Sequence, residues 1–239
     1  MKRLISIILA IAMIATLGAL STAADAGEVA ANKLFTLGLF IGVGDNADGT
    51  PNFELGREPT RAEGVTLLVR FLGKEKEALA GTWNTPFTDV ADWAKPYVGY
   101  AYANGITYGI SYTEYGGSIA ITAAQYLTFI LRALGYEDGY DFSWSSAWTL
   151  SDQIGFTAGE FNSRNNTILR GGVADISFKA LIAKYFGTDT YVIRALYDEK
   201  VVTKQAVVDV GLGKYIEDEK TEEKEKETSS SDDYFSSPA

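Results

Sequence analysis

Apolar side chains recur with the period of an α-helix in three separate stretches, and a glycine follows each stretch. Positions three and four residues apart lie on one face of a helix, so each stretch predicts an amphipathic helix with one buried side. Glycine readily adopts the left-handed conformation that ends many helices. The three sets are Val65, Leu68, Val69 and Leu72 before Gly73; Leu127, Ile130, Leu131 and Leu134 before Gly135; and Ile176, Phe178, Leu181, Ile182 and Tyr185 before Gly187.

The starts of the first two helices match as well. Thr60 precedes the first helix and Glu63 stands three residues later, and Thr122 and Gln125 repeat this spacing 62 positions further along the chain. Such a pair predicts a capping box, in which each residue satisfies a backbone N–H of the other. The third helix opens at Arg170 without this pair. Because the cap, the apolar stripe and the terminal glycine recur together, we interpret the chain as three versions of one unit.

A shorter apolar segment and a glycine-marked turn precede each long helix, and the turn glycines are Gly38, Gly105 and Gly155. A single helix–loop–helix unit would leave an apolar face in water. We therefore expect an all-α fold in which three units pack around a shared axis as a pseudo-threefold helical bundle. The expected units span residues 27–80, 81–138 and 139–203. The last includes a helix over residues 191–197 that is expected to pack beside the first unit and close the ring.

The two ends of the chain differ from its middle. Lys2 and Arg3 precede an apolar run over residues 4–20 and then small residues up to position 26, a pattern typical of a cleaved secretory signal peptide over residues 1–26. An uncleaved membrane anchor is the alternative, because the run is nearly long enough to span a bilayer. No stable membrane insertion is expected after cleavage. Residues 217–233 contain nine acidic residues and three lysines, so the C-terminal segment, residues 204–239, is expected to include a disordered acidic tail.

The chain contains no histidine and no cysteine, which removes zinc hydrolase, Ser-His-Asp and Cys-His chemistry, disulfides and cysteine-linked lipids. No metal or cofactor is expected. The net charge of −10 argues against nucleic acid as a partner. A glycosidase with two carboxylates is the enzymatic alternative, and its candidates lie in no distinctive motif, so we expect no enzyme. Those candidates are Asp89, Glu114, Asp138 and Asp141.

The sequence Thr60-Arg61-Ala62-Glu63, with Phe87-Thr88-Asp89-Val90, Trp93-Ala94 and Gly105-Ile106, resembles the S-layer homology (SLH) repeat family. The similarity covers residues 26–202 as three tandem repeats. It implies an exported, all-α protein of the cell wall and S-layer, held there non-covalently. The implied partner is an anionic secondary cell wall polysaccharide of the peptidoglycan layer, often carrying ketal-linked pyruvate, which binds in grooves between repeats.

The resemblance also implies which residues contact the glycan. Arg61 matches the motif arginine, Arg170 matches it by alignment without the flanking threonine and glutamate, and Ala123 departs from it. Turn glycines approach the ligand in this family, and Trp93 matches its tryptophan. The implied glycan-binding set is Arg61, Arg170, Thr60, Trp93, Gly38, Gly105 and Gly155.

Physical chemistry supports an anion at such an arginine, because the guanidinium donors act together with the positive end of the helix dipole. Structural alternatives stay open. Arg61 and Arg170 could each form a structural ion pair, in the case of Arg61 with Glu63, Glu58 or a neighbouring repeat. Trp93 could fill the core, and Glu63 is favoured as a cap over a catalytic acid. For the whole chain, the alternative is an S-layer or envelope scaffold whose repeats contact other envelope proteins without binding glycan.

Overall fold

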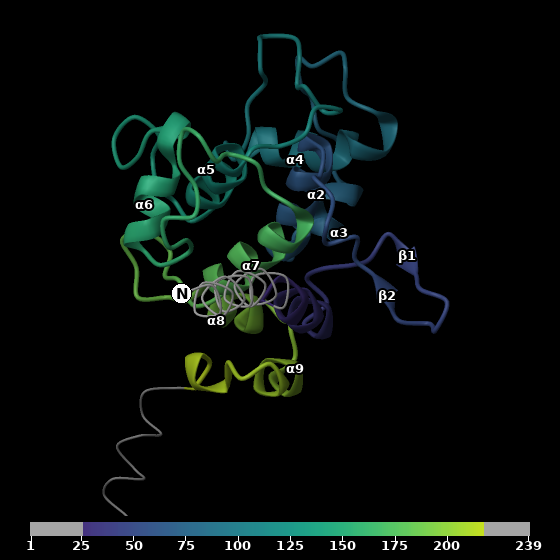
Figure 1. Cartoon of the computed structure of the whole chain (residues 1–239), viewed down its shortest axis with the longest axis vertical. Helices are drawn as coiled ribbons and strands as arrows, with labels where there is room; N and C mark the ends of the chain where they lie inside the picture. Colours follow the sequence, from purple (N-terminus) through teal and green to yellow (C-terminus); the bar gives the residue numbers. More distant parts are fainter. Residues whose placement is uncertain (1–25, 218–239) are drawn as a thin grey trace, which may run out of the picture.

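The structure is a computed structural model, and it describes residues 26–217 (Figure 1). Most of the expected signal peptide, residues 1–25, lies outside the described residues. The expected acidic tail lies outside them from residue 218 onwards. Within residues 26–217, no helix has the length and apolar character needed to cross a membrane.

The described residues are mostly helical, which confirms the predicted all-α fold. Their only sheet is one small antiparallel hairpin, β1 (Gly44–Asp45) with β2 (Pro51–Asn52), which stands away from the helices in Figure 1. A first helical segment covers residues 26–36. The remaining elements are α2 (Arg61–Phe71), α3 (Glu75–Ala80), η1 (Asp92–Ala94), α4 (Lys95–Ala103), α5 (Ala123–Ala133), η2 (Trp144–Ser146), α6 (Trp148–Gln153), α7 (Arg170–Ala180), α8 (Val192–Asp198), α9 (Lys204–Asp209) and η3 (Gly213–Tyr215).

The three predicted long helices are α2, α5 and α7, each of eleven residues. Both predicted capping boxes are present. The Glu63 N–H donates to Thr60 Oγ1 (3.2 Å) and the Thr60 N–H donates to Glu63 Oε2 (2.7 Å), and Thr122 and Gln125 repeat both bonds at the start of α5. No side chain caps α7 in this way. Its first turn is held instead by backbone hydrogen bonds to the segment that precedes α2.

The N-termini of α2, α5 and α7 form a closed cycle of backbone hydrogen bonds, which we call the N-terminal ring. The first turn of each helix donates N–H groups to carbonyls of the segment that precedes another of the three helices. Helix N-termini carry N–H groups without intrahelical partners, so this cycle satisfies donors that would otherwise need water. The bonds run from Arg61 and Ala62 to Ile119 and Gly117 (2.8 and 3.1 Å), from Ala123 to Asn166 (2.9 Å), and from Arg170 and Gly171 to Arg57 and Leu55 (2.9 and 3.0 Å).

The short helices cover the long ones in an ordered way. Helix α4 packs on α2, and α6 packs on α5. Residues 26–36 lie beside α7, where the Lys33 ammonium lies 4.8 Å from the centroid of the Phe178 ring and Gly27 approaches Gly171 closely. The first unit thus reaches back to the third.

The C-terminal part of the fold lies at the opposite end of α2. Lys74, just after α2, forms an ion pair with Glu199 at the end of α8 (2.6 Å). Val201 lies against Gly73, the glycine that ends α2 with a φ of 69°. A side chain at position 73 would meet Val201, so this close approach and the positive φ both require glycine. The end of α8 therefore lies beside the end of α2.

We predict that Asn166→Ala lowers the free energy of unfolding by about 1 kcal/mol, the usual cost of losing an N-terminal cap. Asn166 Oδ1 accepts the Ala124 N–H (2.9 Å) in the first turn of α5, and alanine leaves that donor without its partner. Urea unfolding followed by circular dichroism measures the change. Asn166→Asp is the control, since it keeps the acceptor and places negative charge at a helix N-terminus. Equal losses in both variants would contradict the capping role.

We also predict that Glu63→Gln costs stability at neutral pH and that this cost shrinks in acid. The two hydrogen bonds from Arg57 to Glu63 hold the pKa of Glu63 below its ordinary value of 4.5. A lowered pKa in the folded state means that the stabilisation is present above that ordinary value and is lost as the pH falls through the folded-state pKa. Glutamine keeps the capping box, as Gln125 does in α5.

The measurement is the difference in unfolding free energy between the parent and Glu63→Gln from pH 7 to pH 3. The other carboxylates are common to both proteins, so their contributions cancel in the difference. A difference that stays constant over this range would show that the ionisation of Glu63 does not stabilise the fold.

Candidate functional site

Two cavities of similar construction lie where a buried arginine of one long helix faces another long helix. We call them the Arg61 cavity, with a volume of about 460 Å³, and the Arg170 cavity, with about 390 Å³. Each is lined by four side chains of a helix face, by a turn and by an exposed tryptophan. The Arg61 cavity is lined by Arg61, Tyr108, Gly109, Ile110, Gln125, Thr128, Phe129, Arg132, Asp138 and Trp144. The Arg170 cavity is lined by Ile41, Gly42, Val43, Glu63, Thr66, Leu67, Arg70, Trp93, Tyr97 and Arg170.

Arg61 is the first residue of α2, and its side chain is held rigidly. The residue is only 7% exposed. Its Nη2 donates to the carbonyl oxygen of Tyr108 (2.7 Å), and its guanidinium carbon lies about equally far from the ring centroids of Tyr115 (5.0 Å) and Phe129 (4.9 Å). Burial lowers the pKa of Arg61 from its usual value, but an arginine remains protonated in proteins.

One donor of Arg61 is left over. Within the described part of the chain, Nε is the only fully buried side-chain nitrogen or oxygen without a hydrogen-bond partner. A buried polar group without a partner is costly and marks a place where a further acceptor is missing. Arg61 thus lines the cavity with a guanidinium that has one enclosed donor without a protein partner.

A second arginine, Arg132, faces the same cavity from the last turn of α5. Its Nη2 binds Asp138 Oδ2 (2.9 Å), and its guanidinium carbon lies 4.6 Å from the centroid of the Tyr108 ring. Asp138 also accepts the backbone N–H of Trp144 (2.9 Å). Trp144 is 59% exposed at the rim. The cavity thus has a fixed cationic wall and an aromatic edge.

The Arg170 cavity repeats this construction around the first unit. Arg170 is 3% exposed, its Nε donates to the carbonyl oxygen of Phe53 (2.8 Å), and its guanidinium carbon lies 5.5 Å from the Phe40 ring centroid. Burial also lowers the pKa of Arg170. Trp93 at the rim is 54% exposed. The alternative that Trp93 fills the core is therefore wrong.

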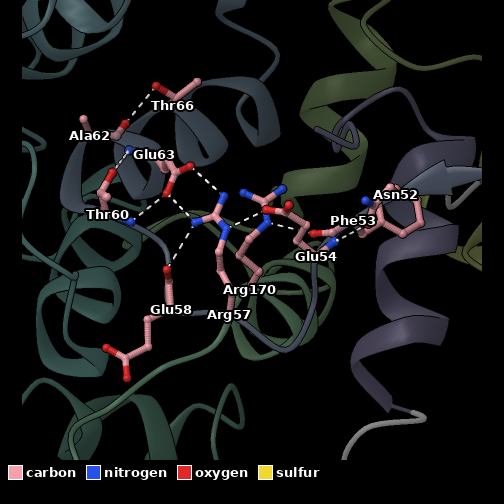
Figure 2. A network of polar contacts seen from close by, with 10 residues as sticks. All are labelled: Asn52, Phe53, Glu54, Arg57, Glu58, Thr60, Ala62, Glu63, Thr66 and Arg170. Carbon is pink, nitrogen blue, oxygen red and sulfur yellow. Dashed lines mark hydrogen bonds and ion pairs between the residues drawn. The ribbon is translucent and has the colours of Figure 1, made fainter. Parts of the chain in front are cut away.

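The ion pair between Arg61 and Glu63, one of the structural alternatives, is not formed. Figure 2 shows Glu63 bound instead by Arg57, whose Nη1 and Nη2 donate to the two carboxylate oxygens (2.8 and 2.7 Å). Arg57 also binds Glu54 (2.6 Å). Residues two apart on a helix do not face each other, which explains why Arg61 and Glu63 point to different places.

The other residues of the implied glycan-binding set do not line the two cavities. Thr60 is the cap of α2 and lines neither cavity. Gly38, Gly105 and Gly155 have positive φ angles (73°, 69° and 82°), as turn glycines should. Of these three, Gly105 lines a smaller cavity beside Arg132, and none lines the two cavities above.

The glycines that do line the cavities, Gly42 and Gly109, follow four residues after the predicted ones. A Cβ on Gly42 would lie 2.7 Å from the Asn52 carbonyl oxygen, and one on Gly109 would press against the carbonyl oxygens of Ser111 and Glu114. Sequence reasoning did not place Arg132, Asp138 or Trp144 among the glycan-binding residues. The 62-residue repeat could have shown Arg132, because it places Arg132 at the position of Arg70.

The first residue of α5, which is equivalent to Arg61 in α2 and Arg170 in α7, is not an arginine. Ala123 begins α5, and its N–H and that of Ala124 are both bound by Asn166, through the backbone carbonyl and the side-chain Oδ1 respectively. No cationic side chain can therefore act from the first residue of α5.

The candidate carboxylates do not assemble a glycosidase pair around the Arg61 cavity. Asp138 is the only one of the four that lines it. Asp89 accepts the N–H groups of Tyr115 and Gly116 (2.7 and 2.8 Å), and Asp141 accepts that of Glu137 (2.7 Å), so both hold loops. Residues 26–217 also contain no group of three or more acidic side chains arranged to hold a metal ion.

Comparison with known proteins gives three relatives, and no family model matches the chain. A surface layer protein of Brevibacillus choshinensis is 31% identical over 159 residues, which is 62% of this chain and 14% of the relative. A cell surface protein of Thermoanaerobacter kivui is 32% identical over 153 residues, 62% of this chain and 19% of the relative. A middle cell wall protein of Brevibacillus brevis is 28% identical over 229 residues, 88% of this chain and 21% of the relative.

The chain spans about a fifth or less of the length of these relatives. Their names describe surface and wall proteins, and none of them names an enzyme. The chain is thus similar to S-layer and cell wall proteins and is located at the cell surface, in association with the envelope.

Proposed function

We propose that the chain consists of three S-layer homology repeats in a pseudo-threefold arrangement, and that it anchors protein to the cell wall by binding an anionic secondary cell wall polysaccharide. The N-terminal ring supports the arrangement, because it links α2, α5 and α7 through equivalent turns. The similarity to surface layer and wall proteins supports the role.

The observation that carries this proposal is the buried, incompletely satisfied guanidinium of Arg61 in an open cavity. A carboxylate such as ketal-linked pyruvate offers acceptor oxygens and a compensating negative charge to the guanidinium that lines this cavity. Charge-assisted hydrogen bonds are stronger than neutral ones. Arg61 is already fixed by Tyr108, Tyr115 and Phe129, so little side-chain entropy is lost when the ligand binds.

The remaining walls suit a sugar. The exposed indole of Trp144 offers a flat apolar surface for the C–H face of a pyranose ring. Gln125 and Thr128 supply neutral hydrogen-bonding groups for hydroxyls. This combination of an aromatic edge, neutral polar groups and a cation matches an acidic sugar unit.

The scaffold alternative also has an observation in its favour. Ile110, Tyr112 and Ile119 lie in the loops between α4 and α5, and all three are more than half exposed. The side chains of Ile110 and Ile119 both lie next to Gly116. Adjacent exposed apolar side chains of this kind favour contact with another protein.

We predict that Arg61→Ala weakens binding to purified secondary cell wall polysaccharide by roughly 10- to 100-fold, the value of one charge-assisted hydrogen bond. Trp144→Ala should weaken binding as well, and its exposed position leaves the fold intact. Co-sedimentation with the polysaccharide measures both effects. Removal of the ketal groups by mild acid should reduce binding of the parent protein.

Arg164→Ala is the matched control, because Arg164 is exposed and lines neither cavity. Unfolding midpoints confirm that each variant is folded. If the folded parent does not bind the polysaccharide, the scaffold alternative gains support. If Trp144→Ala and Arg164→Ala bind like the parent, the Arg61 cavity is not the binding site.

A further inference from the structure

Another cavity, which we call the Tyr100 cavity, lies at the opposite end of the long helices from the N-terminal ring. It has a volume of about 250 Å³ and is lined by α4 and the turn after it, by α8, by Tyr185 and by the C-terminal ends of α2 and α5. It shares only Arg132 with the Arg61 cavity and no residue with the Arg170 cavity. The Tyr100 cavity is therefore a separate candidate site.

Tyr100 differs from the other buried tyrosines in what its hydroxyl contacts. Four tyrosines within residues 26–217 are at least nine-tenths buried, and a buried phenol usually has a hydrogen-bond partner. The Tyr100 hydroxyl forms no hydrogen bond within these residues. The other three are bonded: Tyr97 to Glu75 Oε1 (2.7 Å), Tyr115 to the Arg61 carbonyl oxygen (3.5 Å) and Tyr126 to Ser177 Oγ (2.7 Å).

The Tyr100 hydroxyl remains accessible from the cavity. In the described part of the chain, Arg61 Nε is the only fully enclosed polar side-chain atom without a partner, so the Tyr100 hydroxyl is not fully enclosed. The Tyr100 ring packs edge-to-face on Trp83 (5.3 Å between centroids), and Trp83 Nε1 donates to the Ala78 carbonyl oxygen (2.8 Å). A fixed ring thus presents an unpartnered hydroxyl to the cavity that it lines.

Tyr185 supplies a second phenol to the same cavity, and its hydroxyl also forms no hydrogen bond within residues 26–217. Burial raises the pKa of Tyr100 to about 12, with further contributions from Glu77, Glu199 and Tyr185. Burial and then Glu199 raise the pKa of Tyr185. The two hydroxyls therefore lie near each other and near Glu199. Both keep their protons at neutral pH, so each can donate and accept a hydrogen bond.

The charges around the two hydroxyls argue against an ionic ligand. Glu199 raises the pKa of both phenols, which means that it disfavours negative charge beside them, and neither Lys74 nor Arg132 lowers either pKa. An anionic group at the hydroxyls would meet the same repulsion. A cationic group at Glu199 would compete with the ammonium of Lys74, which already binds that carboxylate (2.6 Å).

We propose that the Tyr100 cavity binds one uncharged polyhydroxylated unit, a neutral sugar or a polyol, through the hydroxyls of Tyr100 and Tyr185. The cavity is several times larger than the share of one water molecule, about 30 Å³. A sugar hydroxyl accepts from a phenol and donates to a carboxylate oxygen. The buried apolar side chains of Leu72, Ile106 and Leu196 line the same cavity and suit the C–H face of the unit.

The test removes single hydroxyl groups from the full chain. Tyr100→Phe deletes the unpartnered hydroxyl and keeps the ring. Two variants are matched controls. Tyr126→Phe deletes a hydroxyl that has a partner, and Tyr140→Phe deletes one from a residue that is 85% exposed and lines none of the cavities described above.

The neutral probes are methyl glucoside, methyl N-acetylglucosaminide and glycerol. Methyl glucuronide is the anionic counterpart of the first probe, and methyl glucosaminide is the cationic counterpart of the second. NMR of protein with ¹³C-labelled tyrosine rings follows binding, and Tyr100→Phe and Tyr185→Phe assign the two signals. Urea unfolding measures the stability of each variant without a probe.

A neutral probe should shift the Tyr100 and Tyr185 signals of the parent and bind Tyr100→Phe roughly fivefold to tenfold more weakly, the loss expected for one neutral hydrogen bond. Its charged counterpart should bind the parent more weakly. Both control variants should keep the parent's affinity. Without a probe, Tyr100→Phe should unfold at the parent's urea midpoint, whereas Tyr126→Phe should unfold at a lower one, because it loses its bond to Ser177.

Co-sedimentation with purified wall polysaccharide distinguishes the two sources of such a unit. Weaker sedimentation of Tyr100→Phe than of the parent would place the unit in the polymer, and equal sedimentation would identify a free sugar or polyol.

The inference is overturned if no neutral probe shifts either tyrosine signal, if Tyr100→Phe binds like the parent, or if a charged counterpart binds more tightly than its neutral match. A loss of stability in Tyr100→Phe equal to that in Tyr126→Phe would also overturn it, because the hydroxyl would then have a partner within the protein. None of these outcomes bears on polysaccharide binding at Arg61, so the proposed function stands or falls separately.

Discussion

The structure depends on how the first turns of three helices find partners for their N–H groups. In most helices water or a capping side chain satisfies these donors. Here the carbonyls of neighbouring connecting segments satisfy several of them, so α2, α5 and α7 hold one another at their N-termini. The capping boxes of α2 and α5 add to this arrangement. The same bonds fix the first turns of α2 and α7, which carry Arg61 and Arg170.

The buried arginines follow from that arrangement. Arg61 and Arg170 each occupy the first position of a long helix, where the backbone is already bound to a neighbouring unit. Their side chains are covered by aromatic rings and bind carbonyl oxygens of other units. Burial of a cation is costly without compensating partners. The residual donor of Arg61 thus keeps part of that cost.

The sequence predicted the parts of the structure that depend on neighbours within a few residues. The apolar stripe and the Thr60 and Thr122 caps identified α2 and α5 because capping and helical periodicity are local. Contacts between units were harder to foresee. The partner of Glu63 is Arg57, which lies in the loop before α2, and no periodic pattern marks a loop residue. Burial in the core was the alternative for Trp93 because large aromatic residues are usually buried, yet Trp93 lies in a short 3₁₀ turn that faces solvent.

The contact between residues 26–36 and α7 joins parts of the chain that are about 145 positions apart in the sequence. Closing so long a loop has an entropic cost, and contacts of this kind slow folding. The nascent polypeptide therefore cannot complete its native topology until the third unit has emerged.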